Sequence, residues 1–180
     1  KTPIKETELL KGELEPTNQW YALTKIHGVK LCEAYNRQYN SNFSCVMPTN
    51  LFGPNDKYGI DSHVIPALIK RIHQSKINRE SYVTIWGDGT PKREFMYVDD
   101  CAKIICKILF NKKYFRLINI GTGEDMTIKN LAEKICKIVG FKGKLKFDKS
   151  MPNGVMKKTL DIREIKRLKY NKFTMFEEAL

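Results

Sequence analysis

Tyr21 and Lys25 stand four residues apart in the stretch NQWYALTKIHGVKLCEAYNRQY, residues 18–39. Residues at this spacing lie on the same face of an α-helix, one turn from each other. A free phenol exchanges protons poorly at neutral pH, and a neighbouring ammonium group favours its phenolate form. A tyrosine held in this way can protonate an alkoxide as hydride reaches a carbonyl carbon. The pair therefore indicates the proton-transfer half of a carbonyl reduction.

The spacing alone is a weak signal, because eight tyrosines and 32 basic residues produce such pairs by chance. An exposed lysine beside a half-buried tyrosine is the alternative. The following residues favour the functional reading: an apolar run at 43–47 is typical of a buried strand and ends at Pro48 and Thr49. Ligands of open parallel sheets bind beyond the carboxyl ends of strands. We therefore expect Asn50 near a cofactor or substrate, although a cap within a loop explains it equally well.

The elements that must position these residues alternate between helix and strand, which predicts an α/β fold. Periodic apolar residues predict a helix from about Gln19 to Tyr39, with Thr17 and Asn18 as candidate caps. Further predicted helices lie at 61–76 (Asp61 and Ser62 as caps), 99–110, 127–140 (Thr127 as cap, Gly140 as end) and within 159–168. The predicted strands lie at 43–47, on both sides of the glycine-rich turn in 82–97, at 116–120 and at 144–148.

The glycines do not form a nucleotide-phosphate loop. The G-x-G pairs Gly87/Gly89 and Gly121/Gly123 lack the third glycine of G-x-G-x-x-G, and the Walker A pattern is missing. The sequence also begins without Met. We therefore expect it to start inside a longer protein, with any dinucleotide-phosphate loop before residue 1.

Bulk composition narrows the function classes. The net charge of +12 favours phosphorylated ligands or nucleic acid, but the basic residues are scattered, which argues against a nucleic-acid-binding arm. No apolar run reaches the length of a membrane span. The five cysteines form no C-x-x-C or zinc pattern, so we expect no metal site and reduced, mostly buried thiols in a cytoplasmic protein.

Several stretches together resemble one known family. YALTK, KLCEAYNRQY, VMPTNLFGP, DSHVIPALIKR, WGDGTPKREFMYVDD and INIGTG are similar to nucleotide-sugar enzymes of the extended short-chain dehydrogenase/reductase family. The similarity covers nearly the whole chain and is greatest to the epimerase-reductases that act on GDP-4-keto-6-deoxy-D-mannose. It implies that residues 1–53 are the last part of a Rossmann domain. Residues 54–180 would be mainly a smaller α/β substrate-binding domain, with a segment near 94–110 returning to the Rossmann domain.

The resemblance also implies roles for the residues near the predicted strand end. Tyr21 would protonate the C4 oxygen of the sugar during hydride transfer from NADPH, and Lys25 would bind the nicotinamide ribose. His63 would act as the acid in epimerisation at C3 and C5 and lie near the cofactor; from the residues alone, a helix cap is its simpler explanation. The implied cofactor-contacting segment comprises Pro48, Thr49, Asn50 and Leu51.

A second implied set binds the GDP-sugar substrate: Asn50, Arg71, Trp86, Arg93, Asn153 and Lys158. Without the resemblance, Arg71 reads as a solvated helix residue and Trp86 as a core aromatic. Asn153 departs from the family, which carries an aspartate there, and an amide hydrogen-bonds a ribose hydroxyl less strongly than a carboxylate does.

The resemblance finally implies a homodimer through the Tyr21–Lys25 helix. Val29, Leu31 and Tyr35 are candidate contact residues, and a place in the core explains them equally well. The family's catalytic serine and cysteine precede the position of residue 1, so the 180 residues alone should be inactive. Two alternatives remain open at this point: another nucleotide-sugar epimerase or dehydratase of the family, or a basic nucleic-acid-binding module without catalytic activity.

Overall fold

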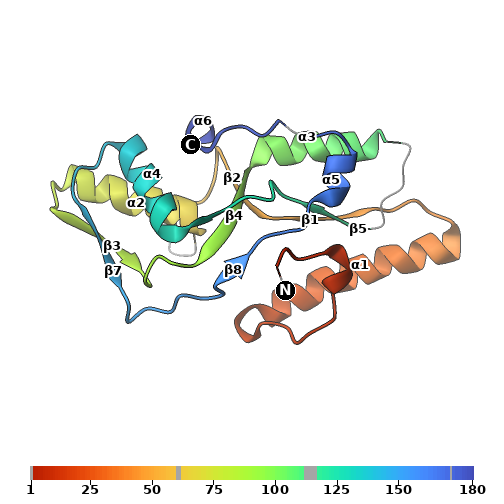
Figure 1. Ribbon diagram of the computed structural model, residues 1–180. Helices are drawn as coiled ribbons and strands as arrows, with labels where there is room; N and C mark the ends of the chain where they lie inside the picture. The colour runs from red at the N-terminus through yellow and green to blue at the C-terminus, as the bar shows by residue number, and fades with distance from the viewer. Residues whose placement is uncertain (1, 60–61, 112–116, 171) are drawn as a thin grey trace.

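The computed structural model describes residues 2–59, 62–111, 117–170 and 172–180 (Figure 1). The helices are the 3-10 helices η1 (Glu6–Glu8) and η2 (Pro16–Asn18), then α1 (Gln19–Tyr39), α2 (Val64–Ile77), α3 (Val98–Leu109), α4 (Ile128–Val139), α5 (Arg163–Arg167) and α6 (Phe176–Ala179). The strands are β1 (Cys45–Pro48), β2 (Asn50–Phe52), β3 (Tyr82–Trp86), β4 (Lys92–Tyr97), β5 (Leu117–Ile120), β6 (Asp125–Thr127), β7 (Lys144–Asp148) and β8 (Lys157–Lys158).

The strands form three small sheets that are mainly parallel, which confirms the predicted α/β class. Strand β1 pairs with β5, and β3 pairs with β7, both in parallel. Strand β4 is the centre of the remaining sheet, with β2 and β8 parallel to it and β6 antiparallel. Because β4 has these three partners, it joins segments that lie far apart in the sequence.

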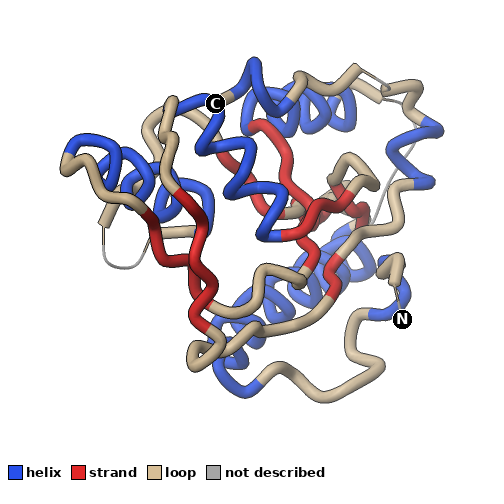
Figure 2. The backbone as a smooth tube through the Cα atoms, turned by 60° about the vertical axis from the view of Figure 1, so that its left-hand side comes forward, coloured by secondary structure: helices blue, strands red, loops and turns tan. Residues whose placement is uncertain are grey.

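Two apolar clusters form the core of the described residues. One lies between α2, α4 and the β3–β7 pair and is built on Ile72, Ile85, Leu131 and Ile135. The other lies under α3 and α5, against β4 and β5, and contains Met96, Ile104, Ile118, Ile120 and Ile165. Figure 2, which is turned by 60° from Figure 1, shows the helices (blue) lying around the strands (red).

Helix α1 spans Gln19–Tyr39, as its periodicity predicts, but none of its residues is buried. Its exposed side chains include Trp20, Leu31 and Tyr35. The end of α1 is fastened to the next segment by Asn36, whose side-chain amide exchanges two 2.8 Å hydrogen bonds with the backbone of Phe43. The helix therefore exposes several large apolar side chains.

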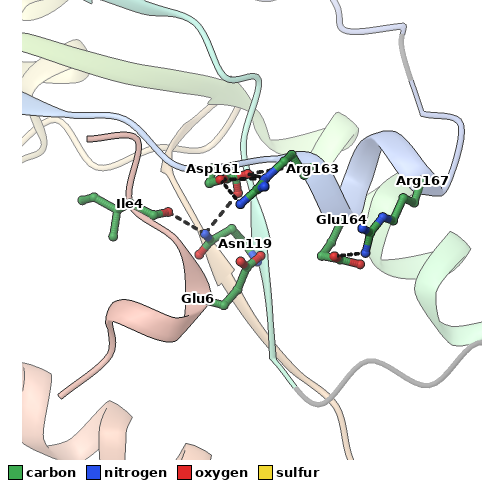
Figure 3. A network of polar contacts seen from close by, with 7 residues as sticks. All are labelled: Ile4, Glu6, Asn119, Asp161, Arg163, Glu164 and Arg167. Atoms are coloured by element: carbon green, nitrogen blue, oxygen red, sulfur yellow. Dashed lines mark hydrogen bonds and ion pairs between the residues drawn. The ribbon is translucent and has the colours of Figure 1, made fainter. Parts of the chain in front are cut away.

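The segment before α1 is attached to Asn119 and to residues 160–161 by a network that is mainly polar (Figure 3). Ile4 forms a parallel bridge with Leu160 and accepts a 2.9 Å hydrogen bond from Asn119 Nδ2. The same amide nitrogen donates to the carbonyl oxygen of Asp161, and Glu6 accepts from the Asn119 backbone. Residues 4–6 and 159–161 are thus held side by side.

Three sequence-based expectations need correction. The predicted strand at 43–47 is shifted to Cys45–Pro48, and the expected loop after it contains β2, which forms only because β4 supplies its hydrogen bonds. The cysteines are not mostly buried: Cys101 is buried, Cys106 is exposed, and Cys32, Cys45 and Cys136 are half-buried. Cys106 is exposed because α3 buries Asp100, Cys101, Ile104 and Ile108, which leaves position 106 on the outer face.

The predicted helix caps are only partly confirmed. Thr127 caps α4 by accepting a hydrogen bond from the Asn130 backbone, and Gly140 ends this helix with φ +74°, as predicted. Asn18 holds the N-cap position of α1 without a side-chain bond, while Thr17 pairs with Glu15. Asp61 lies outside the described residues, and the Ser62 hydroxyl donates to the Gly59 carbonyl. Among the helices described, none is both long and apolar enough to cross a bilayer.

Candidate active site

A cleft of about 800 Å³ opens between five segments of the chain. These are the first turn of α1, the stretch from β1 through β2 to residue 56, the start of α2, the junction of β4 with α3, and residues 158–160. Of the predicted site residues, the lining includes Tyr21, Pro48, Thr49, Asn50, Leu51, His63 and Lys158. The fold therefore brings together seven of the residues that the sequence singled out.

Tyr21 enters this cleft from the first turn of α1, with 61% of its surface exposed. The Lys25 ammonium nitrogen lies 5.3 Å from the centroid of the Tyr21 ring, so the two side chains share one helical face. Lys25 stands over the ring and is not part of the cleft lining. The ammonium group thus makes a cation–π contact with the face of the Tyr21 ring.

Thr49 and Asn50 are held by the central strand. The Thr49 hydroxyl and the Asn50 side-chain nitrogen both donate to the Glu94 carbonyl oxygen, at 3.1 and 2.8 Å. The Thr49 backbone nitrogen also donates to the Ile120 carbonyl, at 2.8 Å. Asn50 is the first residue of β2, and its side-chain amide links β2 to β4. The alternative explanation of Asn50, a cap within a loop, does not describe this position.

His63 occupies the N-cap position of α2, but its side chain forms no capping hydrogen bond. The residue is exposed and lines the cleft. His63 therefore holds the helix-cap position that the simpler explanation gave it. Within the described residues its imidazole forms no capping hydrogen bond, so the ring is available to a bound molecule.

A second group of predicted residues gathers beside β3 instead of in this cleft. The Arg71 guanidinium donates to the Thr84 carbonyl at 3.0 Å and lies 5.2 Å from the Trp86 ring centroid. Trp86 is 59% exposed, so its interpretation as a core aromatic is wrong. Asn153 accepts a 2.9 Å hydrogen bond from the Asp88 backbone, in the turn that follows Trp86.

Arg93 connects the two groups. It is paired in register with Lys158, which lines the cleft, and its guanidinium donates to the carbonyl oxygens of Val155 and Lys92. Burial lowers the pKa of Arg93. Neither Arg93 nor Lys158 has a carboxylate ion-pair partner in the part of the chain that the structure describes. Their positive charge is therefore available to an anionic ligand.

Unlike Arg93 and Lys158, the adjacent Lys92 and Lys157 have a carboxylate partner. Lys92 and Lys157 face Asp125 at 3.8 and 3.2 Å. The pKa of Asp125 is lowered, first by a hydrogen bond from the Thr159 hydroxyl and then by the two lysines. The uncompensated charge of this strand pair thus lies on the Arg93 and Lys158 side.

The glycine pairs of the sequence are used for packing. A Cβ atom on Gly89 would meet the Phe147 ring at 2.4 Å, and one on Gly121 would meet the Glu94 carboxyl group at 2.1 Å. Similar contacts, with Asn153 and Ile162, fill the space beside the two partner glycines. These turns therefore do not offer the open backbone that a diphosphate requires.

Residues 1–121 match the family model described as "NAD dependent epimerase/dehydratase family". The chain belongs to this family. Within it, the chain is 45% identical to the GDP-L-fucose synthase of Sinorhizobium fredii, over 99% of the chain and 57% of that protein. It is 46% identical to the GDP-L-fucose synthase of Escherichia coli, over 93% of the chain and 56% of that protein.

A solved structure of the family shows the same fold. The GDP-L-fucose synthetase of Naegleria fowleri bound to NADP matches with a TM-score of 0.93 and 30% identity, over 99% of this chain and 58% of that one. The chain therefore spans a little more than half the length of the relatives it matches.

The fold of this epimerase/dehydratase family member adds cleft residues that sequence reasoning missed. Asn18, Phe95 and Leu160 line the cleft, and Glu94 lies directly behind it. The sequence marks Asn18 only as a candidate helix cap. Neither Phe95 nor Leu160 carries a chemical group that could have marked it, and only the pairing of distant segments brings them here.

Proposed function

We propose that this chain is part of an NADP(H)-dependent epimerase-reductase that converts GDP-4-keto-6-deoxy-D-mannose to GDP-L-fucose. One observation carries the proposal: Tyr21 from α1 and His63 from the start of α2 line the same cleft. A phenol beside an ammonium group suits proton delivery to an oxygen, and an imidazole suits proton exchange at carbon near neutral pH. The identities of 45% and 46% to two proteins named GDP-L-fucose synthase support this choice of substrate.

The chemistry divides between these two residues. Tyr21 gives its proton to the C4 oxygen of the sugar as hydride arrives at C4, and Lys25 stabilises the resulting phenolate and binds the nicotinamide ribose. The C4 ketone acidifies the neighbouring C–H bonds, so that C3 and C5 can lose their protons to the cysteine base that the family carries before the position of residue 1. His63 returns a proton to the enolate that forms.

NADP(H) supplies the hydride when it is bound. The cleft fits the nicotinamide end of this cofactor, because it combines the Tyr21 hydroxyl and the Asn50 amide with apolar side chains such as Leu51 and Phe52. We assign the contacts with this end to Pro48, Thr49, Asn50, Leu51 and His63. Among the described residues, the glycine turns do not fit the diphosphate end, since packing fills them.

The residues around β3 and β8 suit the GDP portion of the substrate. Arg71, Arg93 and Lys158 supply positive charge for a diphosphate, and the exposed Trp86 ring offers a stacking face. Asn50 and Asn153 add amide groups for hydroxyl groups of the ligand. Asn153 should bind a ribose hydroxyl more weakly than the carboxylate it replaces.

The proposal extends to organisation and assembly. Residues 1–53 form the last part of a Rossmann domain, and residues 54–180 mainly form the substrate-binding domain, with the segment near 94–110 returning to the Rossmann domain. The protein is a cytoplasmic homodimer that pairs through α1. The exposure of Leu31 and Tyr35, beside the half-buried Val29, supports α1 as the contact surface.

The decisive experiment is an assay of the full-length protein with NADPH and the GDP-linked 4-keto sugar. We expect NADPH oxidation and GDP-L-fucose as the product, and no turnover by residues 1–180 alone. Thermal-shift measurements should show stabilisation by GDP-sugars over UDP- and dTDP-sugars. A preference for UDP- or dTDP-sugars would instead indicate a different nucleotide-sugar enzyme, and binding of RNA or DNA without any response to nucleotide sugars would refute the enzymatic proposal.

The role of His63 can be tested separately. In His63→Gln we expect exchange of the C3 and C5 hydrogens with deuterated solvent to slow by about a hundredfold or more, because the proton-exchanging imidazole is lost. NMR of the recovered sugar nucleotide measures this exchange. His73→Gln is the matched control, since His73 is an exposed residue of the same helix outside the cleft. Unchanged exchange in His63→Gln would remove His63 from the mechanism.

A further inference from the structure

We infer that Glu94 is a positioning residue that fixes the two walls of the candidate cleft relative to each other. Its effect on turnover rests on the proposed function, whereas its effect on the geometry of the cleft does not. Glu94 lies on β4 between Arg93 and Phe95 and has no exposed surface. It is not itself part of the cleft lining.

The backbone of Glu94 holds one wall. Its carbonyl oxygen accepts hydrogen bonds from the Thr49 hydroxyl at 3.1 Å and from the Asn50 side-chain nitrogen at 2.8 Å. Both donors line the cleft. The second bond orients the Asn50 amide, which would otherwise rotate freely at an exposed position, and the first fixes the neighbouring Thr49 hydroxyl.

The side chain of Glu94 holds the opposite wall. One carboxyl oxygen accepts a 2.8 Å hydrogen bond from the Leu160 backbone, and Leu160 lines the cleft together with Lys158. The other oxygen accepts a 2.8 Å bond from the Gly123 backbone and a longer one from the Thr122 hydroxyl. One residue thus bonds to both sides of the cleft, through its backbone on one side and its carboxyl group on the other.

The surroundings of this carboxyl group are shaped to receive it. A Cβ atom on Gly121 would lie 2.1 Å from the Glu94 carboxyl oxygen, so the space that a side chain at 121 would need is occupied by the carboxyl group. The group is therefore confined between Gly121, Gly123 and Leu160.

Burial of the Glu94 carboxyl group costs desolvation energy, so a contribution to stability does not explain why a carboxyl group occupies this position. Within the described residues, the Glu94 carboxyl group accepts hydrogen bonds from backbone and hydroxyl donors and forms no ion pair with a lysine or arginine. A buried acidic group held by neutral donors costs desolvation energy, and an apolar side chain of similar size is often at least as stabilising. Its value therefore lies in the defined distance it imposes between β2 and residues 158–160.

The first test is Glu94→Gln in the full-length protein. The amide keeps the size of the side chain, but its NH₂ group must face the N–H of either Gly123 or Leu160, and one hydrogen bond is lost in both orientations. We expect kcat/KM for the sugar nucleotide to fall about tenfold to hundredfold, because a displacement of catalytic groups by about 1 Å has an effect of this size. Part of the loss should appear in kcat.

Asp100→Asn is the matched control. Asp100 is 2% exposed and accepts hydrogen bonds from the Thr174 backbone at 2.6 Å and the Tyr170 hydroxyl at 3.1 Å. None of these three residues lines the cleft. We expect this variant to lose stability to a similar extent, measured by chemical denaturation, while keeping its kinetic constants.

Hydrogen exchange gives a readout independent of activity. Amide exchange at residues 158–160 and 50–52 should become faster in Glu94→Gln and remain unchanged in Asp100→Asn. If Glu94→Gln does not fold, Glu94→Asp serves instead, because its carboxyl group is one methylene short of its donors. Equal kinetics and equal exchange in the Glu94 and Asp100 variants would overturn the inference. If the wild-type protein does not turn over the GDP-sugar, the proposed function fails, and the exchange pattern alone decides the role of Glu94.

Discussion

At the scale of single residues, the environment of Tyr21 determines what the side chain can do. Eight tyrosines occur in the chain, and Tyr21 combines a place in the cleft with a lysine ammonium 5.3 Å from its ring. Tyr39, on the last turn of the same helix, is equally exposed at 61% but packs against Tyr35 instead. A comparison of Tyr21 with Tyr39 therefore distinguishes the effect of a place in the cleft from the effect of exposure to solvent.

Replacement of Tyr21 by phenylalanine should lower kcat of the full-length enzyme by about a hundredfold or more, because the proton donor to C4 is removed. The rate of NADPH oxidation measures this loss. Tyr39→Phe should retain full activity. Retained activity in Tyr21→Phe would show that another group delivers the proton.

At the scale of elements, the helices differ in the contacts that fix their ends. The ends of α4 are fixed by residues within or next to the helix: the Thr127 hydroxyl caps its start, and Gly140 ends it at φ +74°. Leu131 and Ile135 are buried on one face of this helix. Helix α1 has an uncapped start and no buried residue. Its position therefore depends on its flanks, namely the Asn36–Phe43 bonds and the network of Ile4.

This contrast predicts different effects of removing the two N-cap side chains. Thr127→Ala should lower the free energy of unfolding by about 1 kcal/mol, since the Asn130 N–H loses its acceptor. Asn18→Ala should change it little, because the Asn18 side chain forms no cap bond. Urea denaturation of the full-length protein measures both. A larger loss in Asn18→Ala than in Thr127→Ala would contradict the assignment of the caps.

At the scale of the whole molecule, the contacts that join the N-terminal segment to Asn119 and Asp161 are polar (Figure 3). Asp161 accepts hydrogen bonds from the Arg163 backbone and guanidinium at 3.0 Å, and its carbonyl oxygen accepts from Asn119. The Arg163 hydrogen bond is the main cause that lowers the pKa of Asp161. The charged form of Asp161 is therefore favoured in the folded protein.

A carboxyl group whose pKa is depressed by folding stabilises the protein above its unfolded pKa, and this contribution is lost as pH falls through the folded value. Asp161→Asn should therefore lower the free energy of unfolding by about 1 kcal/mol at pH 7. The difference from wild type should shrink below about pH 4. Denaturation curves across this range measure it. Glu13→Gln, which removes an exposed carboxyl group, should show no such dependence. A constant difference at all pH values would exclude the ionised form as the source.

Local sequence determined the parts of this protein that depend on neighbours within a few turns. The limits of α1, the cap and end of α4 and the shared face of Tyr21 and Lys25 follow from residue spacing, because the contacts involved span three or four residues. The α/β class follows from the alternation of such segments.

Only the tertiary structure decided which distant segments meet. Strand β2 exists because β4 pairs with it, and Lys158 reaches the cleft because β8 pairs with the same strand. The separation of the Arg71–Trp86 pair from the Tyr21 cleft, and the burial of Glu94 behind it, depend on the same pairings. Hydrogen bonds between strands join residues tens of positions apart, and the spacing within each strand carries no information about its partner.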